Sequence, residues 1–278
     1  MAASMVKAPN DTPHRQLAPG EFVGVADHRL ELNFGVIAFI REQERIERHE
    51  HSDTHFVLVV EGEYLTAAQN AGGAVGPGDV LLNTPGTRHE DQFAGAGKLI
   101  TFSVADKILD TFTENSGLSG AARRVRGGEP AAALNAIARE ASDLDEVSDL
   151  EIEGLTYELL ASATGQWPAT RKPPWLERAR AQIRHSSGGA LSIKTLARDA
   201  DVHPVHLTRA FRAFFGQTPG AMTRRIRMQK AASLLARTHS PICEIALECG
   251  FSDQAAFTKA FKRASSISPL VFRRRWRR

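Results

Sequence analysis

Several residue types and patterns are scarce in this 278-residue chain. It has two cysteines, Cys243 and Cys249, which are too few for a disulfide scaffold and favour a reducing, cytoplasmic setting. No apolar run approaches the roughly 20 residues that a membrane helix needs, and the N-terminus shows no apolar signal segment, so we expect no secretory leader. The mix of 42% hydrophobic and 24% charged residues excludes a wholly disordered or collagen-like chain.

Charge is distributed very unevenly along the chain. Residues 1–170 carry 13 Lys and Arg against 26 Asp and Glu, a net charge of −13, whereas residues 171–278 carry 22 against 6, a net charge of +16. This split indicates two separately built parts. It also predicts a polyanionic partner for the basic part, although mutual neutralisation of the two halves is an alternative.

Changes of pattern suggest five segments. The proline-containing segment 1–19 is typical of a loose arm. Residues 20–105 hold short apolar runs between Gly and Pro, which predict a sandwich or small β-barrel. Residues 106–164 change to a helical period, and residues 165–174 contain three prolines and predict a linker. Residues 175–278 have a helical pattern that is interrupted at 188–189, 216–219 and 239–241. The expected fold class is therefore α+β with several domains.

The basic part contains an internal repeat. The segment 193–200 matches 242–249 at an offset of 49, and the segment 207–212 then matches 257–262 at an offset of 50. Small residues at 197 and 246 allow two helices to cross closely, and turn residues follow at 201 and 250. The pattern predicts a duplicated helix–turn–helix, in which the second helix of each copy can enter a major groove.

Local signals refine both copies. Ser192 and Ser240 are predicted to cap the first helices, and His203 and Ser252 the second ones. The larger apolar residues of the second helices should face the core at i, i+4 spacing: Leu207, Phe211, Phe257 and Phe261. The basic and hydroxyl residues between them, including Thr208, should then face outward.

The C-terminal part resembles the AraC family of bacterial transcription regulators over about residues 175–273. The resemblance is carried by Leu207–Pro219, by Glu244–Gln254 and by the segment from Phe257 to Arg273. It implies a long linker helix over about 219–237 that holds the two motifs in successive turns of the major groove, about 34 Å apart. Ser266 and Phe272 stand where the family usually has Gly and Tyr, and the first change bears on the end of a helix.

The same resemblance implies a set of DNA-binding residues. Arg209 can pair with guanine and Gln254 with adenine, whereas the more distal basic residues suit phosphate. The base-facing positions correspond to Val205, His206, Thr208 and Arg209 in the first motif and Gln254, Ala255, Thr258 and Lys259 in the second, with Arg212, Lys262 and Arg263 expected on phosphates.

The acidic part contains a group of histidines. His49 and His51 alternate on an extended segment and so point the same way, and a barrel could bring His55 and His89 to them. Together with Gly62 and Gly78, this spacing resembles the two short motifs of cupin barrels, except that His55 replaces the usual carboxylate. The four imidazoles suit either the polar lining of an effector pocket or a divalent metal such as Zn, Fe, Ni or Cu.

The interpretation is a non-enzymatic, DNA-binding transcription regulator with an effector in a cupin-like barrel. The apolar faces of the helices at 106–164 need burial, and the resemblance implies that they form a homodimer. RNA polymerase is a further expected partner by analogy. A cupin metalloenzyme tethered to DNA and a constitutive regulator without a ligand are the alternatives.

Overall fold

The computed structural model describes residues 15–23, 25–42, 45–68, 71, 73–93, 96–113, 122–125, 128–164, 173–185 and 191–276. The predicted arm and linker therefore lie largely outside the described residues. The chain forms two compact units, which we call the sheet unit and the helical unit. The sheet unit is built mainly on residues 38–103, and the helical unit mainly on residues 125–278.

The sheet unit confirms the expected β-rich N-terminal part. Its short apolar runs form two hydrogen-bonded sheets within the described residues. One sheet has the order β1 (Arg15–Leu17), β4 (Arg45–His51), β9 (Arg88–Phe93), β6 (Tyr64–Thr66) and β7 (Gly73–Val75). The other has the order β11 (Arg123–Val125), β8 (Val80–Asn83), β5 (His55–Glu61), β10 (Gly97–Val104), β3 (Gly35–Glu42) and β2 (Val25–Leu32).

Alternating side chains of these strands make the core between the sheets. Val57, Val59 and Leu81 of the second sheet pack with Ile46 and Phe93 of the first, all nearly inaccessible to solvent. Burial of each such side chain contributes about 1.5–3 kcal/mol. The pairing of β4 with β9 sets His49 directly opposite His89, which carries the histidines to one place in this interior.

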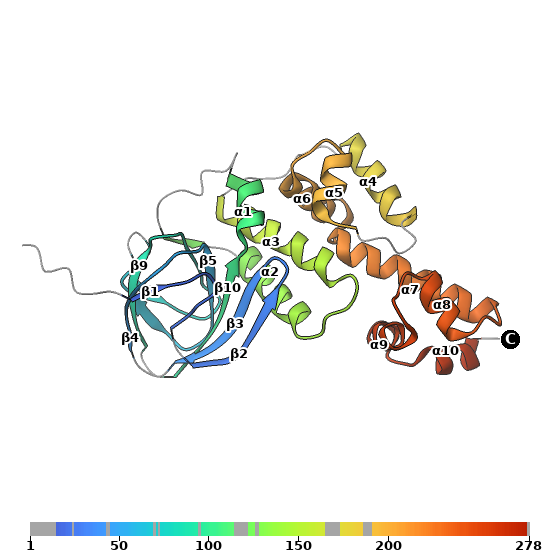
Figure 1. Ribbon diagram of the computed structural model, residues 1–278, viewed down its shortest axis with the longest axis horizontal. Helices are drawn as coiled ribbons and strands as arrows, with labels where there is room; N and C mark the ends of the chain where they lie inside the picture. The colour runs from blue at the N-terminus through green and yellow to red at the C-terminus, as the bar shows by residue number, and fades with distance from the viewer. Residues whose placement is uncertain are drawn as a thin grey trace, which may run out of the picture. The chain divides into compact units, whose positions relative to one another are not determined.

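The helical unit contains the described helices of the chain (Figure 1). They are α1 (Asp106–Thr113), α2 (Gly128–Ala141), α3 (Ser148–Thr164), α4 (Pro174–His185), α5 (Ile193–Asp199), α6 (Pro204–Phe215), α7 (Pro219–Arg237), α8 (Ile242–Glu248), α9 (Gln254–Ser265) and α10 (Pro269–Trp276). Helices α5 and α6 form one helix–turn–helix, α8 and α9 form the other, and α7 runs between them. The predicted repeat and linker helix are therefore confirmed.

The capping predictions are confirmed in the first copy and wrong in the second. The Ser192 hydroxyl accepts from the Thr195 N–H at 3.0 Å, and His203 caps α6 as expected. Helix α8 instead begins after Pro241 with no side-chain cap, and the carboxylate of Asp253 caps α9. A carboxylate is a strong cap. The neighbouring Ser252 hydroxyl donates instead to the Glu146 carboxylate.

The two copies have matching cores and matching turns. Leu207, Phe211, Phe257 and Phe261 are all buried, as predicted. Helix α6 ends at Gly216 with φ 66°, and α9 ends at Ser266 with φ 63°. This left-handed conformation favours glycine, so the serine carries backbone strain at a position where its counterpart carries none.

Candidate functional site

The second helix of each motif carries the residues predicted to meet DNA. On α9 the side chains of Gln254, Ala255, Lys259, Lys262 and Arg263 are exposed, and Thr258 is half-buried. The first turn of this helix is thus accessible along the face that a major groove would receive. The predicted residues of the second motif are therefore exposed apart from the half-buried Thr258, and their contact with DNA stays a prediction.

In the first motif, fewer of the residues predicted to meet DNA are exposed than in the second. On α6, His206 is exposed beside the Trp175 ring, with the ring centroids 5.9 Å apart, and Arg209 is partly exposed. Val205 and Thr208, however, are buried at 4% and 0% exposure, so the prediction that Thr208 faces outward is wrong. The reason is tertiary: helix α3 packs on this face of α6, and Gly154 leaves room there for the Thr208 methyl group.

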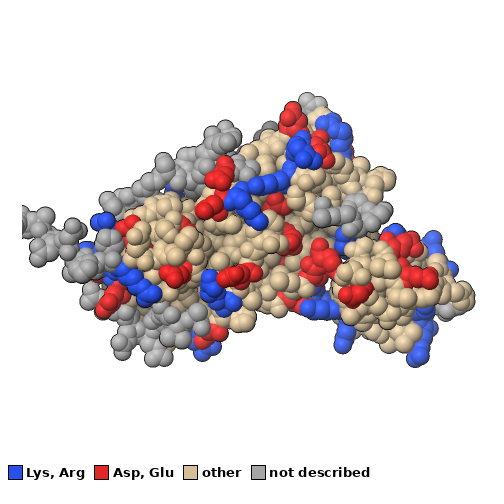
Figure 2. Space-filling model, in the orientation of Figure 1, with Lys and Arg blue, Asp and Glu red and all other residues tan. Residues whose placement is uncertain are grey.

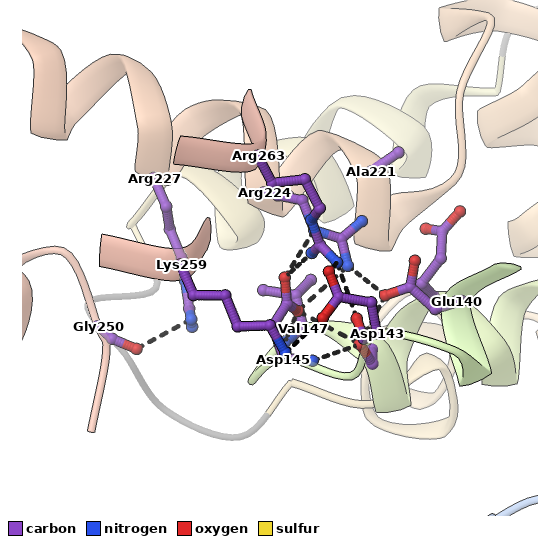
Figure 3. Close-up of polar contacts among 12 residues, drawn as sticks. Glu140, Asp143, Asp145, Val147, Ala221, Arg224, Arg227, Gly250, Lys259 and Arg263 are labelled. Carbon is purple, nitrogen blue, oxygen red and sulfur yellow. Dashed lines mark hydrogen bonds and ion pairs between the residues drawn. The ribbon is translucent and has the colours of Figure 1, made fainter. Parts of the chain in front are cut away.

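Several basic residues of the motifs are held by acidic residues of α2, α3 and the loop between them. Arg212 donates to both oxygens of Glu158, at 3.2 and 2.9 Å. Figure 3 shows a second group, in which Arg263 lies 3.0 Å from Asp143 and also pairs with Asp145. Lys259 pairs with Asp143 as well. Acidic and basic side chains are accordingly interspersed on the face seen in Figure 2.

The histidines form one buried cluster in the sheet unit. His49, His51, His55 and His89 are each 7% exposed or less. The centroids of the His49 and His89 rings are 4.1 Å apart, and those of His51 and His55 are 4.0 Å apart. The prediction that these four histidines converge is confirmed. His49, His51 and His89 each offer a ligand atom, and these atoms lie within 4.8 Å of one another.

Hydrogen bonds orient two of these rings. The Nδ1–H of His49 donates to the Glu47 carbonyl at 2.8 Å, and that of His89 donates to the Asp91 carboxylate at 3.0 Å. Each bond leaves Nε2 with its lone pair available, and the Nε2 of His89 is buried without a hydrogen-bond partner. A carboxylate or carbonyl behind the histidine is the usual outer shell of a metal ligand.

Burial favours the neutral form of His49, His51 and His55. Burial and the neighbouring His89 lower the pKa of His49 to about 4. Burial, followed by the charge of His55, lowers the pKa of His51 still further. The pKa of His55 is also lowered, chiefly by burial. Neutral imidazole is the form that binds metals.

Three polar residues of the cluster were not predicted. Asp53 lies 3.4 Å from the Nδ1 of His55, Asp91 lies behind His89, and the Asn83 amide lies 3.0 Å from the Nε2 of His55. The spacing His89-x-Asp91 is a signal for Asp91, because alternate residues of a strand share a face. Asp53 lies between the end of β4 and the start of β5, so strand alternation does not predict it. The position of Asn83 depends on the pairing of β5 with β8, which the sequence does not display.

The cavity at this cluster is small. Its volume is about 30 Å³, and it is lined by the four histidines together with apolar residues such as Phe22 and Leu81. That is room for one water molecule or ion, whereas sites for small organic ligands generally occupy about 300–1,000 Å³. In this conformation the polar interior therefore fits an ion better than an organic molecule.

Together these features define a protein in which a β-rich domain with a polar interior is followed along the chain by two basic helix–turn–helix modules. Residues 196–275 match the family model of a helix-turn-helix domain, and residues 33–160 match that of an AraC-like ligand binding domain. The chain belongs to the AraC family of DNA-binding transcription regulators, a non-enzymatic class.

Relatives at more than 30% identity match about a third of the chain. A probable transcription factor PqrA from Proteus vulgaris is 37% identical over 99 residues, which cover 36% of this chain and 77% of that protein. The HTH-type transcriptional regulator Rv1931c of Mycobacterium tuberculosis is 37% identical over 91 residues, covering 33% of this chain and 35% of its own length. The chain thus spans only about a third of the latter protein.

A similar solved structure is the C-terminal domain of AraT, a response regulator from Geobacillus stearothermophilus. It is 37% identical, covers 39% of this chain and 91% of that one, and has a TM-score of 0.37. Among the described residues, no helix combines the length and the apolar character required to cross a membrane.

Proposed function

We propose that the N-terminal turns of α6 and α9 read DNA bases in successive turns of the major groove. The observation that carries this proposal is the exposed first turn of α9 with Gln254 and Ala255, together with the exposed Lys259, which matches Arg209 of the other copy at the offset of 50. Arg209 and Lys259 suit guanine, and Gln254 suits adenine. The full set is Val205, His206, Thr208 and Arg209 on α6, Gln254, Ala255, Thr258 and Lys259 on α9, and Arg212, Lys262 and Arg263 on phosphates.

Selection of the full chain against a random duplex pool at a stated salt concentration tests this proposal. We expect a motif of two blocks about one helical turn apart. Replacing Arg209 or Lys259 by alanine should relax the preference in one block only, with a loss of about 1–3 kcal/mol. Recovery of sequence-independent, strongly salt-sensitive binding alone would contradict base reading by these helices.

The sheet unit is proposed to hold the effector that controls DNA binding. An effector that binds one arrangement of the chain more tightly shifts the population toward that arrangement. We also propose that the chain works in the cytoplasm as a homodimer that contacts RNA polymerase. The burial of apolar faces that suggested a dimer through α2 and α3 is met in part inside the chain, because these helices pack on each other and α3 packs on α5, α6 and α7.

A divalent transition metal is the effector class that the histidine cluster favours. His49, His51 and His89 would hold it, with Asp91 and the Glu47 carbonyl orienting two of the rings. The buried Nε2 of His89, which has no hydrogen-bond partner, is the specific observation in favour. When bound, such an ion supplies a fixed positive charge and links β4 to β9.

Equilibrium dialysis of the full chain with Zn²⁺, Ni²⁺ and Cu²⁺, followed by metal analysis, tests this assignment. We expect close to one ion per chain, and its loss in His89→Ala. The matched control is His28→Ala, since His28 is exposed on β2 and away from the cluster. Equal metal content in both variants would refute the assignment, and an organic effector would then have to enlarge the cavity.

A further inference from the structure

Helices α2 and α3 and the loop between them form an acidic hairpin, defined here as residues 128–164. It contains nine acidic residues and one basic residue. Its two helices pack on each other, and it belongs to the same compact unit as the helix–turn–helix motifs. The hairpin is thus a strongly anionic element within reach of the DNA-reading surfaces.

The hairpin covers the reading face of the first motif. Val205, Thr208 and Arg212 share one face of α6 at i, i+3 and i+7 spacing. Gly154 and Glu158 meet this face from α3, with the Thr208 methyl 3.7 Å from the position of a Gly154 side chain. A residue that is wholly buried against a helix cannot contact a base edge, so this face is closed to DNA.

The hairpin also holds the second motif. The Asp143 carboxylate pairs with Lys259 and Arg263, and its carbonyl accepts from Arg263 at 2.7 Å (Figure 3). Asp145 pairs with Arg263 as well, and the Ser252 hydroxyl donates to Glu146 at 3.0 Å. Basic side chains that would meet guanine or phosphate are therefore occupied by carboxylates, which present the same charge and acceptor geometry as DNA.

The contact between the hairpin and the helix–turn–helix elements buries carboxylates. Burial raises the pKa of Glu151, Glu153 and Glu158, all of which face the helix–turn–helix elements from α3. Glu153 accepts from the Ile193 N–H at 2.6 Å, and Glu151 accepts from Thr218. Burying carboxylates is costly even when they are paired, so the pairing only partly offsets the loss of hydration. An interface of this kind can be displaced by a stronger polyanion.

We propose that the acidic hairpin is an intramolecular competitor of DNA: it covers Thr208 and holds Arg212 on α6, it pairs with Lys259 and Arg263 on α9, and DNA binds only after the hairpin leaves these residues. This inference rests on the proposed reading of DNA by α6 and α9. It makes the fraction of chain with a released hairpin a factor in the apparent affinity for DNA. Any effector that draws the hairpin away then acts as an activator of DNA binding.

Hydrogen–deuterium exchange on the unmodified chain tests the competition directly. The probe is the duplex recovered by the selection described above. We expect exchange of the α3 amides to rise when the duplex is bound, because packing on α6 is lost. Unchanged protection of α3 in the saturated complex would overturn the proposal, since it would show that both partners are accommodated together.

Charge neutralisation provides a second test. The double variant Asp143→Asn and Glu158→Gln keeps side-chain shape, and it spares Asp145, which also accepts from the Val147 N–H within the hairpin. We expect the labelled duplex to bind about three- to tenfold more tightly. The control Glu63→Gln and Asp110→Asn removes the same charge from exposed sites outside the hairpin.

The outcomes separate this inference from the proposed function. An equal gain of affinity in both double variants would indicate only long-range electrostatics and would overturn the inference. If Arg209→Ala and Lys259→Ala weaken duplex binding but neutralising the hairpin leaves it unchanged, the inference is wrong and the proposed reading of DNA by α6 and α9 is supported. If the two alanine variants bind as the unmodified chain does, the proposed reading surface itself is wrong.

Discussion

Replacing Gly220 by alanine should separate α7 from α3 without altering any charge or any residue proposed to touch DNA. A methyl group at this position would lie 2.7 Å from both the backbone N and Cα of Glu151, against about 3.4 Å for ordinary contact. Two backbones would have to move apart by about 0.7 Å. Overpacking of this kind costs about 1–3 kcal/mol. Within α7 the same change favours the helix by up to about 1 kcal/mol.

The expected result is a tighter complex with the selected duplex. If the closed form predominates, destabilising it by 1–3 kcal/mol raises the apparent affinity by about 5–150-fold. Fluorescence anisotropy of the labelled duplex at fixed salt measures this change, and circular dichroism verifies that the helices remain.

Gly154→Ala is the matched control, because it adds the same methyl group to the same interface. Here the nearest atoms, in Ile193 and Thr208, lie at an ordinary 3.7 Å. We therefore expect the affinity for DNA to stay the same or fall. Equal affinity in Gly220→Ala and the unmodified chain, or an equal rise in both variants, would refute the assignment of these contacts to a closed form.

Three further predictions concern stability. Ser266→Gly should raise the free energy of unfolding of the second motif by about 0.5–1 kcal/mol, and Gly216→Ser should lower that of the first motif, because both positions have positive φ. Denaturant titration followed by circular dichroism measures both changes. A lower free energy of unfolding in Ser266→Gly would contradict the strain argument. The pKa of His49 falls from 6.5 to about 4 on folding, so the stability linked to its neutral form is complete above pH 6.5 and is lost as the pH falls toward 4. With a chelator present, the free energy of unfolding of the sheet unit should be about 2 kcal/mol lower at pH 5 than at pH 7.5. A free energy of unfolding that does not change over this range would oppose a neutral buried His49. Arg227 is buried and donates to a turn carbonyl at 2.9 Å, so Arg227→Ala should destabilise the second motif by about 2–4 kcal/mol in urea titrations, whereas Arg225→Ala on the exposed face of the same helix should change little.

The local sequence signals of the repeat were sufficient to predict the helices and turns of both helix–turn–helix motifs. The spacing of Leu207, Phe211, Phe257 and Phe261 follows the helical period, and α7 begins and ends within the residues that the resemblance implied. The cap of α9 was less predictable. Ser252 and Asp253 are adjacent and both can cap a helix, and the choice depends on Glu146, which is more than a hundred residues away.

The histidine cluster was predictable in its members and not in its surroundings. His49 and His51 share a face because they alternate on one strand, which is a local property. Their approach to His89, and the small volume between the sheets, depend on strand pairing and register. These are set by packing of the whole interior, which no short segment encodes.

By itself, the sequence determined the two-part organisation, the duplicated motif, the basic character of the reading helices and the identity of the converging histidines. These features depend on short-range periodicity and on composition, which are visible in any window of the chain. Only the tertiary structure decided that the acidic and basic parts neutralise each other at particular pairs such as Arg212 with Glu158, and that Thr208 is buried rather than exposed. Such pairings arise from helices brought together across long sequence separations, where close approach at glycines and burial of charge, not local propensity, select the partner.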